Sequence, residues 1–359
     1  MNEKISIGDK DVIFLLGAGC SFDATVPVSG GMIIKLEELL QKDNRDVYKL
    51  YLYIKHTMEY GNKLFDIDQD FNIESLMVVL HCLENYKKNQ FYPFIIGYSN
   101  DLREYAGKDF EHIKNLIKII EEELPNWVTL DSYTTADYYE NFEKFQKEIT
   151  YPIRIFSLNY DLCLEENIKC KVETGFAQDK AWNGNRFSQS EDDEETAIYL
   201  YKLHGSIDWH RRDDGTLIKS SKQKIKSDII FGTSMKLQAI DPYLFYLYEF
   251  RRYALSSRII VAIGYSFNDN HINDLIRQAL NNNHLRKLIV VEPVGTDVEQ
   301  TELKRIKKKL QIEEDGVILL EKMGAKEFLN EKLSLEYIGS KLPAERLPFW
   351  KCNNWVEEI

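Results

Sequence analysis

The chain has 359 residues, of which 44% are hydrophobic and 29% charged, a balance typical of a folded protein with a sizeable core. Its 46 Lys and Arg against 58 Asp and Glu give a net charge of −12, which excludes nucleic-acid binding through bulk positive charge. Five cysteines without a CxxC pair exclude a zinc ribbon. No apolar run approaches the ~20 residues of a membrane helix. We therefore expect a cytoplasmic protein with reduced thiols.

Six apolar segments are predicted to be strands: residues 12–16, 153–158, 198–203, 259–263, 288–291 and 317–320. They lack the alternation of a half-exposed strand, so both faces are expected to be buried, as in a parallel sheet. Helical patterns such as residues 271–280 and 301–310 separate several of them. This alternation predicts an α/β fold with a doubly wound, mostly parallel, Rossmann-like sheet.

Residues 32–150 have a different pattern, in which apolar residues recur at helical spacing in 33–40, 76–83 and 110–120. This predicts a large helical insertion between the first and second strands. Near the other end of the chain, the basic run at residues 304–309 is interpreted as a solvated helix face, with contact to a nucleotide or partner as the alternative.

Polar or glycine motifs follow five of the predicted strands, at the sheet edge where ligands bind in open α/β folds. The first is Gly17-Ala18-Gly19, whose backbone N–H groups are placed to approach a pyrophosphate, with the Ser21 hydroxyl as a further phosphate ligand. Phe22 stands where the dehydrogenase fingerprint has its third glycine, so that fingerprint is incomplete. The alternative is a tight turn without a ligand.

Asn159 and Asp161 follow the second strand, and His204 follows the third. An asparagine can bond a sugar hydroxyl and a water at once, and histidine titrates near neutrality, which suits a general base. The alternatives are helix capping for Asn159 and Asp161 and a structural turn for His204.

Gly264 opens a second glycine turn that could hold the adenosine half of a dinucleotide, and Glu292 follows a strand where an acid can bind ribose hydroxyls. Here the alternatives are a helix N-cap at Asp269 or Asn270 and a surface acid at Glu292.

Four ordered motifs resemble the sirtuin-like superfamily, specifically its zinc-less bacterial anti-phage defence branch: GAGCS at 17–21, SLNYD at 157–161, KLHGS at 202–206 and IGYSFND at 263–269. The resemblance spans residue 12 to about residue 292. It implies that Asn159 orients the ribose or the attacking water, that Asp161 lies on the nicotinamide side, and that His204 is the general base. It also implies that phosphates are held by Gly17, Ala18, Gly19 and Ser21, and the adenosine end by Gly264, Ser266 and Glu292.

Deacylating sirtuins carry a four-cysteine zinc module that this chain lacks, so we expect no metal. The zinc-less members hydrolyse NAD⁺ in anti-phage defence, often with a HerA-like ATPase. The resemblance therefore implies an NAD⁺ glycohydrolase that releases nicotinamide and ADP-ribose, forms a homo-oligomer and works with an ATPase, translocase or other defence partner. The alternatives are a zinc-less deacylase, an ADP-ribosyltransferase, or a non-catalytic module that senses NAD or ADP-ribose.

On this reading, residues 1–335 form a sirtuin-like NAD-binding domain that includes the helical insertion at 32–150. Residues 336–359 form a C-terminal tail. The tail's Phe349, Trp350 and Trp355 are expected either to contact another copy of the chain or to pack back on their own domain.

Overall fold

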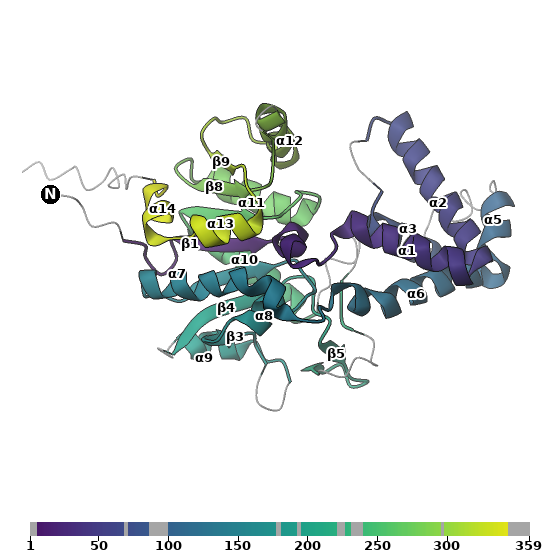
Figure 1. Cartoon of the computed structure of the whole chain (residues 1–359), viewed down its shortest axis with the longest axis horizontal. Helices are drawn as coiled ribbons and strands as arrows, with labels where there is room; N and C mark the ends of the chain where they lie inside the picture. The colour runs from purple at the N-terminus through teal and green to yellow at the C-terminus, as the bar shows by residue number, and fades with distance from the viewer. Residues whose placement is uncertain are drawn as a thin grey trace, which may run out of the picture.

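The computed structural model describes residues 6–67, 71–85, 100–176, 181–191, 195–220, 227–230, 240–295 and 298–343. Within these ranges, seven parallel strands form one sheet in the order β3-β4-β2-β1-β7-β8-β9, drawn in Figure 1. This confirms the predicted α/β class. The strands are β1 (Val12–Leu16), β2 (Ile153–Ser157), β3 (Lys171–Glu173), β4 (Thr196–Lys202), β7 (Ile259–Ile263), β8 (Lys287–Val291) and β9 (Ile318–Glu321).

The central strand β1 shows why these segments lack alternation. All five of its residues are buried, and they divide between two hydrophobic clusters, one on each face of the sheet. Val12, Phe14 and Leu16 belong to one cluster, whereas Ile13 and Leu15 belong to the other. A strand covered by helices on both faces needs apolar residues at every position.

Two groups of helices supply those covers. The cluster around Phe14 includes residues of α7 (Asn141–Ile149), α8 (Cys163–Asn167), α13 (Ala325–Glu331) and α14 (Leu335–Ser340). The cluster around Ile13 includes residues of α9 (Asn185–Glu191), α10 (Tyr243–Ser256), α11 (Asn270–Asn282) and α12 (Glu299–Leu310).

The order of the strands defines a topological switch point between β1 and β7. Without the edge strand β3, the remaining six run 3-2-1-4-5-6 in chain order, which is the arrangement of dinucleotide-binding sheets. The chain leaves β1 toward β2 and β4, then crosses back to β7 on the other side. Ligands of such sheets bind at the carboxyl ends of the strands beside this point.

The predicted helical insertion forms a lobe beside the sheet, built from α1 (Ser29–Asp43), α2 (Arg45–Leu64), α3 (Ile73–Glu84), α5 (Asn100–Ala106) and α6 (Glu111–Val128) (Figure 1). The last part of residues 32–150 is not in this lobe. There η4 (Tyr133–Glu140) and α7 return to the sheet, because Phe142 and Phe145 pack edge-on against Phe14 with ring centroids 5.2 and 5.7 Å away.

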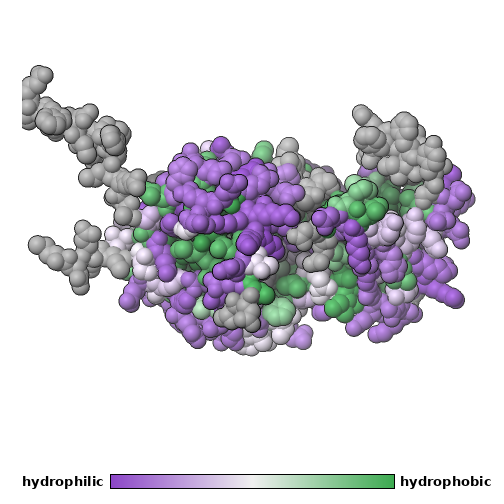
Figure 2. All heavy atoms as spheres, turned by 90° about the horizontal axis from the view of Figure 1, so that it is seen from above, coloured by the Kyte–Doolittle hydropathy of each residue, from purple (hydrophilic) through white to green (hydrophobic). Residues whose placement is uncertain are grey.

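The sequence pattern did not indicate β3 or the small hairpin of β5 (Trp209–Arg211) and β6 (Leu217–Lys219), each only three residues long. Phe349, Trp350 and Trp355 of the predicted tail lie outside the described residues. None of the helices in the described ranges combines the length and apolar character required to cross a bilayer. Seen from above, much of the surface is hydrophilic, with smaller hydrophobic areas between (Figure 2).

Candidate functional site

A cavity of about 380 Å³ lies at the carboxyl edge of the sheet beside the switch point. The helical lobe closes it from the other side through residues 26–30, Met32, 71–74 and Val128. All predicted site residues except Ser21 line it, namely Gly17, Ala18, Gly19, Asn159, Asp161, His204, Gly264, Ser266 and Glu292. Five separate sequence motifs are thereby brought to one cavity.

The glycine turn after β1 packs backbone against backbone on the turn after β7. The N–H of Gly17 donates to the carbonyl of Ile263 at 2.9 Å, and that of Gly19 donates to the carbonyl of Gly264 at 3.0 Å. A Cβ on Gly17 would lie 2.5 Å from the Gly264 oxygen. These glycines are therefore required for close approach of the two turns, and their amides are already engaged. The Ala18 amide donates in neither of these two bonds, so a phosphate contact at this turn stays a prediction for Ala18.

Ser21 is fully buried and lies beneath the turn rather than at the cavity surface. Its hydroxyl donates to Asp161 Oδ2 at 2.8 Å, shares a 2.8 Å hydrogen bond with the Tyr139 hydroxyl, and accepts from Asn159 Nδ2 at 3.3 Å. This placement corrects the expectation that Ser21 reaches a phosphate. Its hydroxyl instead fixes the side chains of Asn159 and Asp161.

Asn159 lines the cavity with a side chain that is 7% exposed. Its Nδ2 is held by Ser21, but Oδ1 is buried and has no hydrogen-bond partner among the described residues. Leaving a buried amide oxygen unpaired costs about 1–3 kcal/mol, so this atom is suited to accept a hydrogen bond from a ligand or a water. Asp161 differs, because its Oδ1 also accepts the N–H of Cys163, the first residue of α8, at 3.0 Å, although the N-cap residue of that helix is Leu162.

Lys202, the last residue of β4, joins the ends of β2 and β4. Its buried ammonium donates to the Asp161 carbonyl at 2.5 Å, to Glu165 Oε1 at 3.0 Å and to the Ser206 hydroxyl at 3.0 Å. The loops that carry Asn159 and His204 are therefore fixed to each other.

His204 forms a buried pair with Asp269. Nε2 of the histidine lies 3.1 Å from Oδ2 of the aspartate, and the two residues are 5% and 4% exposed. The other carboxylate oxygen of Asp269 accepts the N–H groups of His271 and Ile272, so the predicted N-cap is present as well. Sequence reasoning identified only the cap, because three strand positions separate β4 from β7 and nothing local links the two residues.

The loop that delivers Asp269 is held rigidly. The Tyr265 hydroxyl donates to Asn273 Oδ1 at 2.8 Å, and Asn273 Nδ2 donates to the Phe267 carbonyl at 2.8 Å. Phe267 itself has a positive φ of 58°, which only a well-determined loop sustains. Asp269 therefore reaches His204 from a fixed position.

Glu292 lines the cavity at the end of β8 and pairs with Arg305 of α12. Burial, together with repulsion from Glu302, raises the pKa of Glu292 to about 7, although Arg305 acts against the rise. Arg305 Nη2 lies 3.4 Å from Glu292 Oε2, and Nη1 donates to the Ser266 carbonyl at 3.0 Å. The basic run on α12 is thus not only a solvated face, because one of its residues supports the site.

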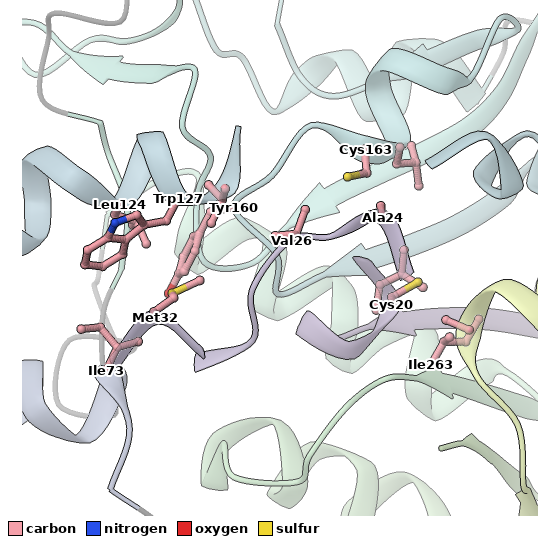
Figure 3. Close-up of a cluster of buried hydrophobic side chains, with 14 of the residues drawn as sticks. Cys20, Ala24, Val26, Met32, Ile73, Leu124, Trp127, Tyr160, Cys163 and Ile263 are labelled. Carbon is pink, nitrogen blue, oxygen red and sulfur yellow. The ribbon is translucent and has the colours of Figure 1, made fainter. Parts of the chain in front are cut away.

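The helical lobe contributes Glu74, which the sequence analysis did not single out, to the cavity wall. Burial, with smaller contributions from the charges of Glu74 and Asp269, raises the pKa of Tyr160, which also lines the cavity. Figure 3 shows Tyr160 with Met32 and Ile73, side chains of the lobe that pack in the same hydrophobic cluster. The lobe therefore shares a hydrophobic cluster with Tyr160 at the cavity wall.

No group of three or more His, Cys, Asp or Glu side chains with metal-binding geometry occurs in the part of the chain that the structure describes. Burial raises the pKa of the Cys20 thiol, which lies below the glycine turn, to about 12. That thiol is therefore not a nucleophile at neutral pH.

A family model of the SIR2-like domain matches residues 153–314, which include the loops of Asn159, His204, Asp269 and Glu292. The match supports the predicted sirtuin-like resemblance for that part of the chain. A solved Sir2 homologue–NAD complex is similar at 11% identity and a TM-score of 0.42, over 92% of this chain and 91% of that chain. A Sir2 homologue variant bound to 2′-O-acetyl-ADP-ribose is similar at 12% identity and a TM-score of 0.43, over 94% and 95%. No curated protein matches the sequence.

Proposed function

We propose that this chain is an NAD⁺ glycohydrolase, which cleaves NAD⁺ into nicotinamide and ADP-ribose. The observation that carries the proposal is that one cavity holds the buried His204–Asp269 pair and Asn159 Oδ1, which has no partner in the described ranges. The SIR2-like match of residues 153–314 supports the same chemistry.

The dimensions of the site suit a dinucleotide. Its polar groups extend from the end of β4 to the end of β8, which are four strand positions apart. At ~4.8 Å per strand this is about 19 Å, the span of an extended dinucleotide across a switch point. The cavity of about 380 Å³ falls within the range of small-molecule pockets.

The side chains then have distinct roles in hydrolysis. Nicotinamide leaves as a neutral molecule, so its departure needs no general acid, and positive charge develops on the ribose. Asn159 Oδ1 is placed to accept a hydrogen bond from a ribose hydroxyl or from the attacking water, which orients it. When Asp269 holds a proton on Nε2 of His204, Nδ1 is the basic nitrogen of the ring and takes the proton that water loses on bonding to C1′.

The test is incubation of the purified chain with NAD⁺ and without a peptide. We expect equal amounts of nicotinamide and ADP-ribose, and loss of both in Asn159→Ala and His204→Ala. Exposed Asn281 and His284 give matched controls, Asn281→Ala and His284→Ala, which should retain turnover. Intact NAD⁺ after hours, with the partner present, would contradict the proposal. Release only after adding an acyl-lysine peptide or acceptor protein would identify a deacylase or transferase.

We further propose that the activity depletes cellular NAD⁺ during phage infection, and that the chain acts as a homo-oligomer with an ATPase, translocase or other defence partner. The four-motif resemblance to the defence branch supports this proposal. Co-expression with the neighbouring gene, followed by measurement of NAD⁺ on infection, tests it. An NAD⁺ level that stays constant in infected cells carrying both genes would contradict it.

A further inference from the structure

We propose that Tyr139 is a positioning residue of the site, which acts through Ser21 to keep the amide oxygen of Asn159 turned toward the cavity. Tyr139 belongs to η4, the segment by which the chain returns from the helical lobe to the sheet. The inference deepens the proposed function, because its catalytic consequence rests on Asn159 acting in hydrolysis.

The Ser21 hydroxyl has all of its hydrogen-bonding positions filled. It carries one proton, which it donates to Asp161 Oδ2 at 2.8 Å, and its oxygen can accept two hydrogen bonds. That oxygen lies 3.3 Å from Asn159 Nδ2 and 2.8 Å from the Tyr139 hydroxyl. Because the single proton of Ser21 is already donated, Tyr139 is the donor in the hydrogen bond that the two hydroxyls share.

Tyr139 is suited to be a permanent donor. Its side chain is 1% exposed, and burial raises the pKa of its hydroxyl well above the usual range, so the proton stays on the oxygen. The neighbouring thiols of Cys20 and Cys163 do not change this order, because a thiol is a weak donor and a weak acceptor. Protons are therefore donated from Tyr139 to Ser21 and from Ser21 to Asp161.

This order determines which end of the Asn159 amide faces Ser21. A hydroxyl without a proton to spare can bond the amide nitrogen but not the amide oxygen, so Nδ2 turns to Ser21 and Oδ1 turns away from it. Oδ1 then has no partner among the described residues, on a side chain that lines the cavity. A Ser21 hydroxyl that was free to donate would also bond the opposite orientation, in which the amide presents a donor to the ligand.

The orientation matters for the attack of water on C1′. An acceptor oxygen binds a proton of the water and leaves a lone pair free to form the bond to C1′, while the electrons of the bond from C1′ to nicotinamide leave with nicotinamide. A donor nitrogen would bind that lone pair instead and weaken the nucleophile. His204 takes the proton that the water loses, so Asn159 contributes orientation and not acid–base chemistry.

Tyr138 provides a matched control for Tyr139. The two rings stack with centroids 4.9 Å apart, and both side chains are 1% exposed. The Tyr138 hydroxyl, however, donates to the Cys20 backbone carbonyl at 2.7 Å. Tyr139→Phe and Tyr138→Phe therefore each remove one buried hydroxyl from the same segment, but only the first leaves Ser21 without its donor.

Steady-state kinetics with NAD⁺ tests the catalytic consequence. We expect Tyr139→Phe to lower kcat by ~10–10²-fold and to change KM by less than ~3-fold, because the groups that bind the dinucleotide stay in place. Tyr138→Phe should change kcat by less than ~3-fold. Ser21→Ala should lower kcat at least as much as Tyr139→Phe, and the double variant should lose no more than Ser21→Ala alone, because both changes break one chain of hydrogen bonds.

The side-chain amide signal of Asn159 in a nuclear magnetic resonance spectrum, assigned by its loss in Asn159→Ala, tests the orientation without ligand or turnover. In the wild type one Nδ2 proton bonds to Ser21, so it should exchange with solvent more slowly than those of exposed Asn281. Tyr139→Phe should speed this exchange, whereas Tyr138→Phe should leave it unchanged. The wild-type comparison tests the orientation even if Tyr139→Phe does not fold.

The inference would be overturned by a wild-type Asn159 amide that exchanges as fast as that of Asn281, or by equal effects of Tyr139→Phe and Tyr138→Phe. A kcat loss from Tyr139→Phe that recurs in full in the Ser21→Ala background would overturn it as well. If the amide signal behaves as expected but the wild type releases no nicotinamide, the proposed hydrolysis fails and the positioning of Asn159 stands. If the wild type releases nicotinamide and both tyrosine variants turn over equally, the positioning fails and the hydrolysis stands.

Discussion

The two sides of the switch point differ in how they hold their polar groups. On the β2–β4 side, Asn159, Asp161 and His204 are 7%, 6% and 5% exposed. On the β7–β8 side, the side chains of Glu292 and Arg305 are 29% and 28% exposed and meet at 3.4 Å. Electrostatic interactions are stronger where water is excluded. Under the proposed function, this difference suits bond cleavage on the first side and recognition of the adenosine end on the second.

The largest expected effect lies on the buried side. His204→Ala removes the proposed base, which should lower kcat by ~10²–10⁴-fold. Binding of ADP-ribose should change by only a few-fold, because Glu292 and the glycine turns remain. Rapid-quench measurement of nicotinamide, combined with calorimetry, separates the two effects. Near-normal kcat in this variant would show that the buried side is not where cleavage occurs.

The next largest effect is expected where the two sides meet, at the contact between the glycine turns after β1 and β7. Gly264 has a φ of +63°, and a Cβ there would lie 2.2 Å from the Cys20 nitrogen. Gly264→Ala should therefore cost at least ~4 kcal/mol of unfolding free energy. Gly61→Ala, on an open face of α2, is the control and should stabilise by ~0.5–1 kcal/mol. Chemical denaturation measures the unfolding free energy of both variants. If Gly264→Ala were as stable as Gly61→Ala, the two turns would not depend on their close contact.

Much of this architecture could be predicted from the sequence, because β1 and β7 each carry five consecutive buried residues that read as strands without any distant information. The pairing of His204 with Asp269 could not, since it depends on where the β7–α11 loop ends in space. The role of Ser21 was likewise inaccessible, because a hydroxyl beside a glycine turn can face either the ligand or the core. Its full burial and its hydrogen bonds to Asp161, Tyr139 and Asn159 show that it faces the core.

A smaller effect should follow from changing the partner of His204. Asp269→Asn keeps a good N-cap for α11 but removes the negative charge, so stability should fall by less than ~1 kcal/mol. Turnover should fall by ~10–10³-fold because the ring loses its preferred tautomer. A pH–rate profile tests this, since the acidic limb, which reports protonation of the base, should shift to lower pH in the variant. A profile identical to that of the wild type would show that Asp269 serves only as a cap.

The smallest effect concerns the exposed side. The pKa of Glu292 is raised from 4.5 to about 7, so the fold disfavours its charged form and loses stability as pH rises between these values. Glu292→Gln removes this loss. Relative to the wild type, the unfolding free energy of the variant should be about 1 kcal/mol more favourable at pH 8 than at pH 4.5. This value allows for the partial exposure of Glu292 and for the loss of its pair with Arg305. Thermal unfolding at both pH values measures it, and the same difference at each would contradict the assignment.

A structure of the His204→Ala chain soaked with NAD⁺ tests the central claim most directly. The account predicts one dinucleotide across the switch point, with its nicotinamide ribose within hydrogen-bond distance of Asn159 Oδ1 and its adenosine ribose against Glu292. A dinucleotide bound elsewhere, or bound in the cavity with Asn159 Oδ1 still unpartnered, would contradict it.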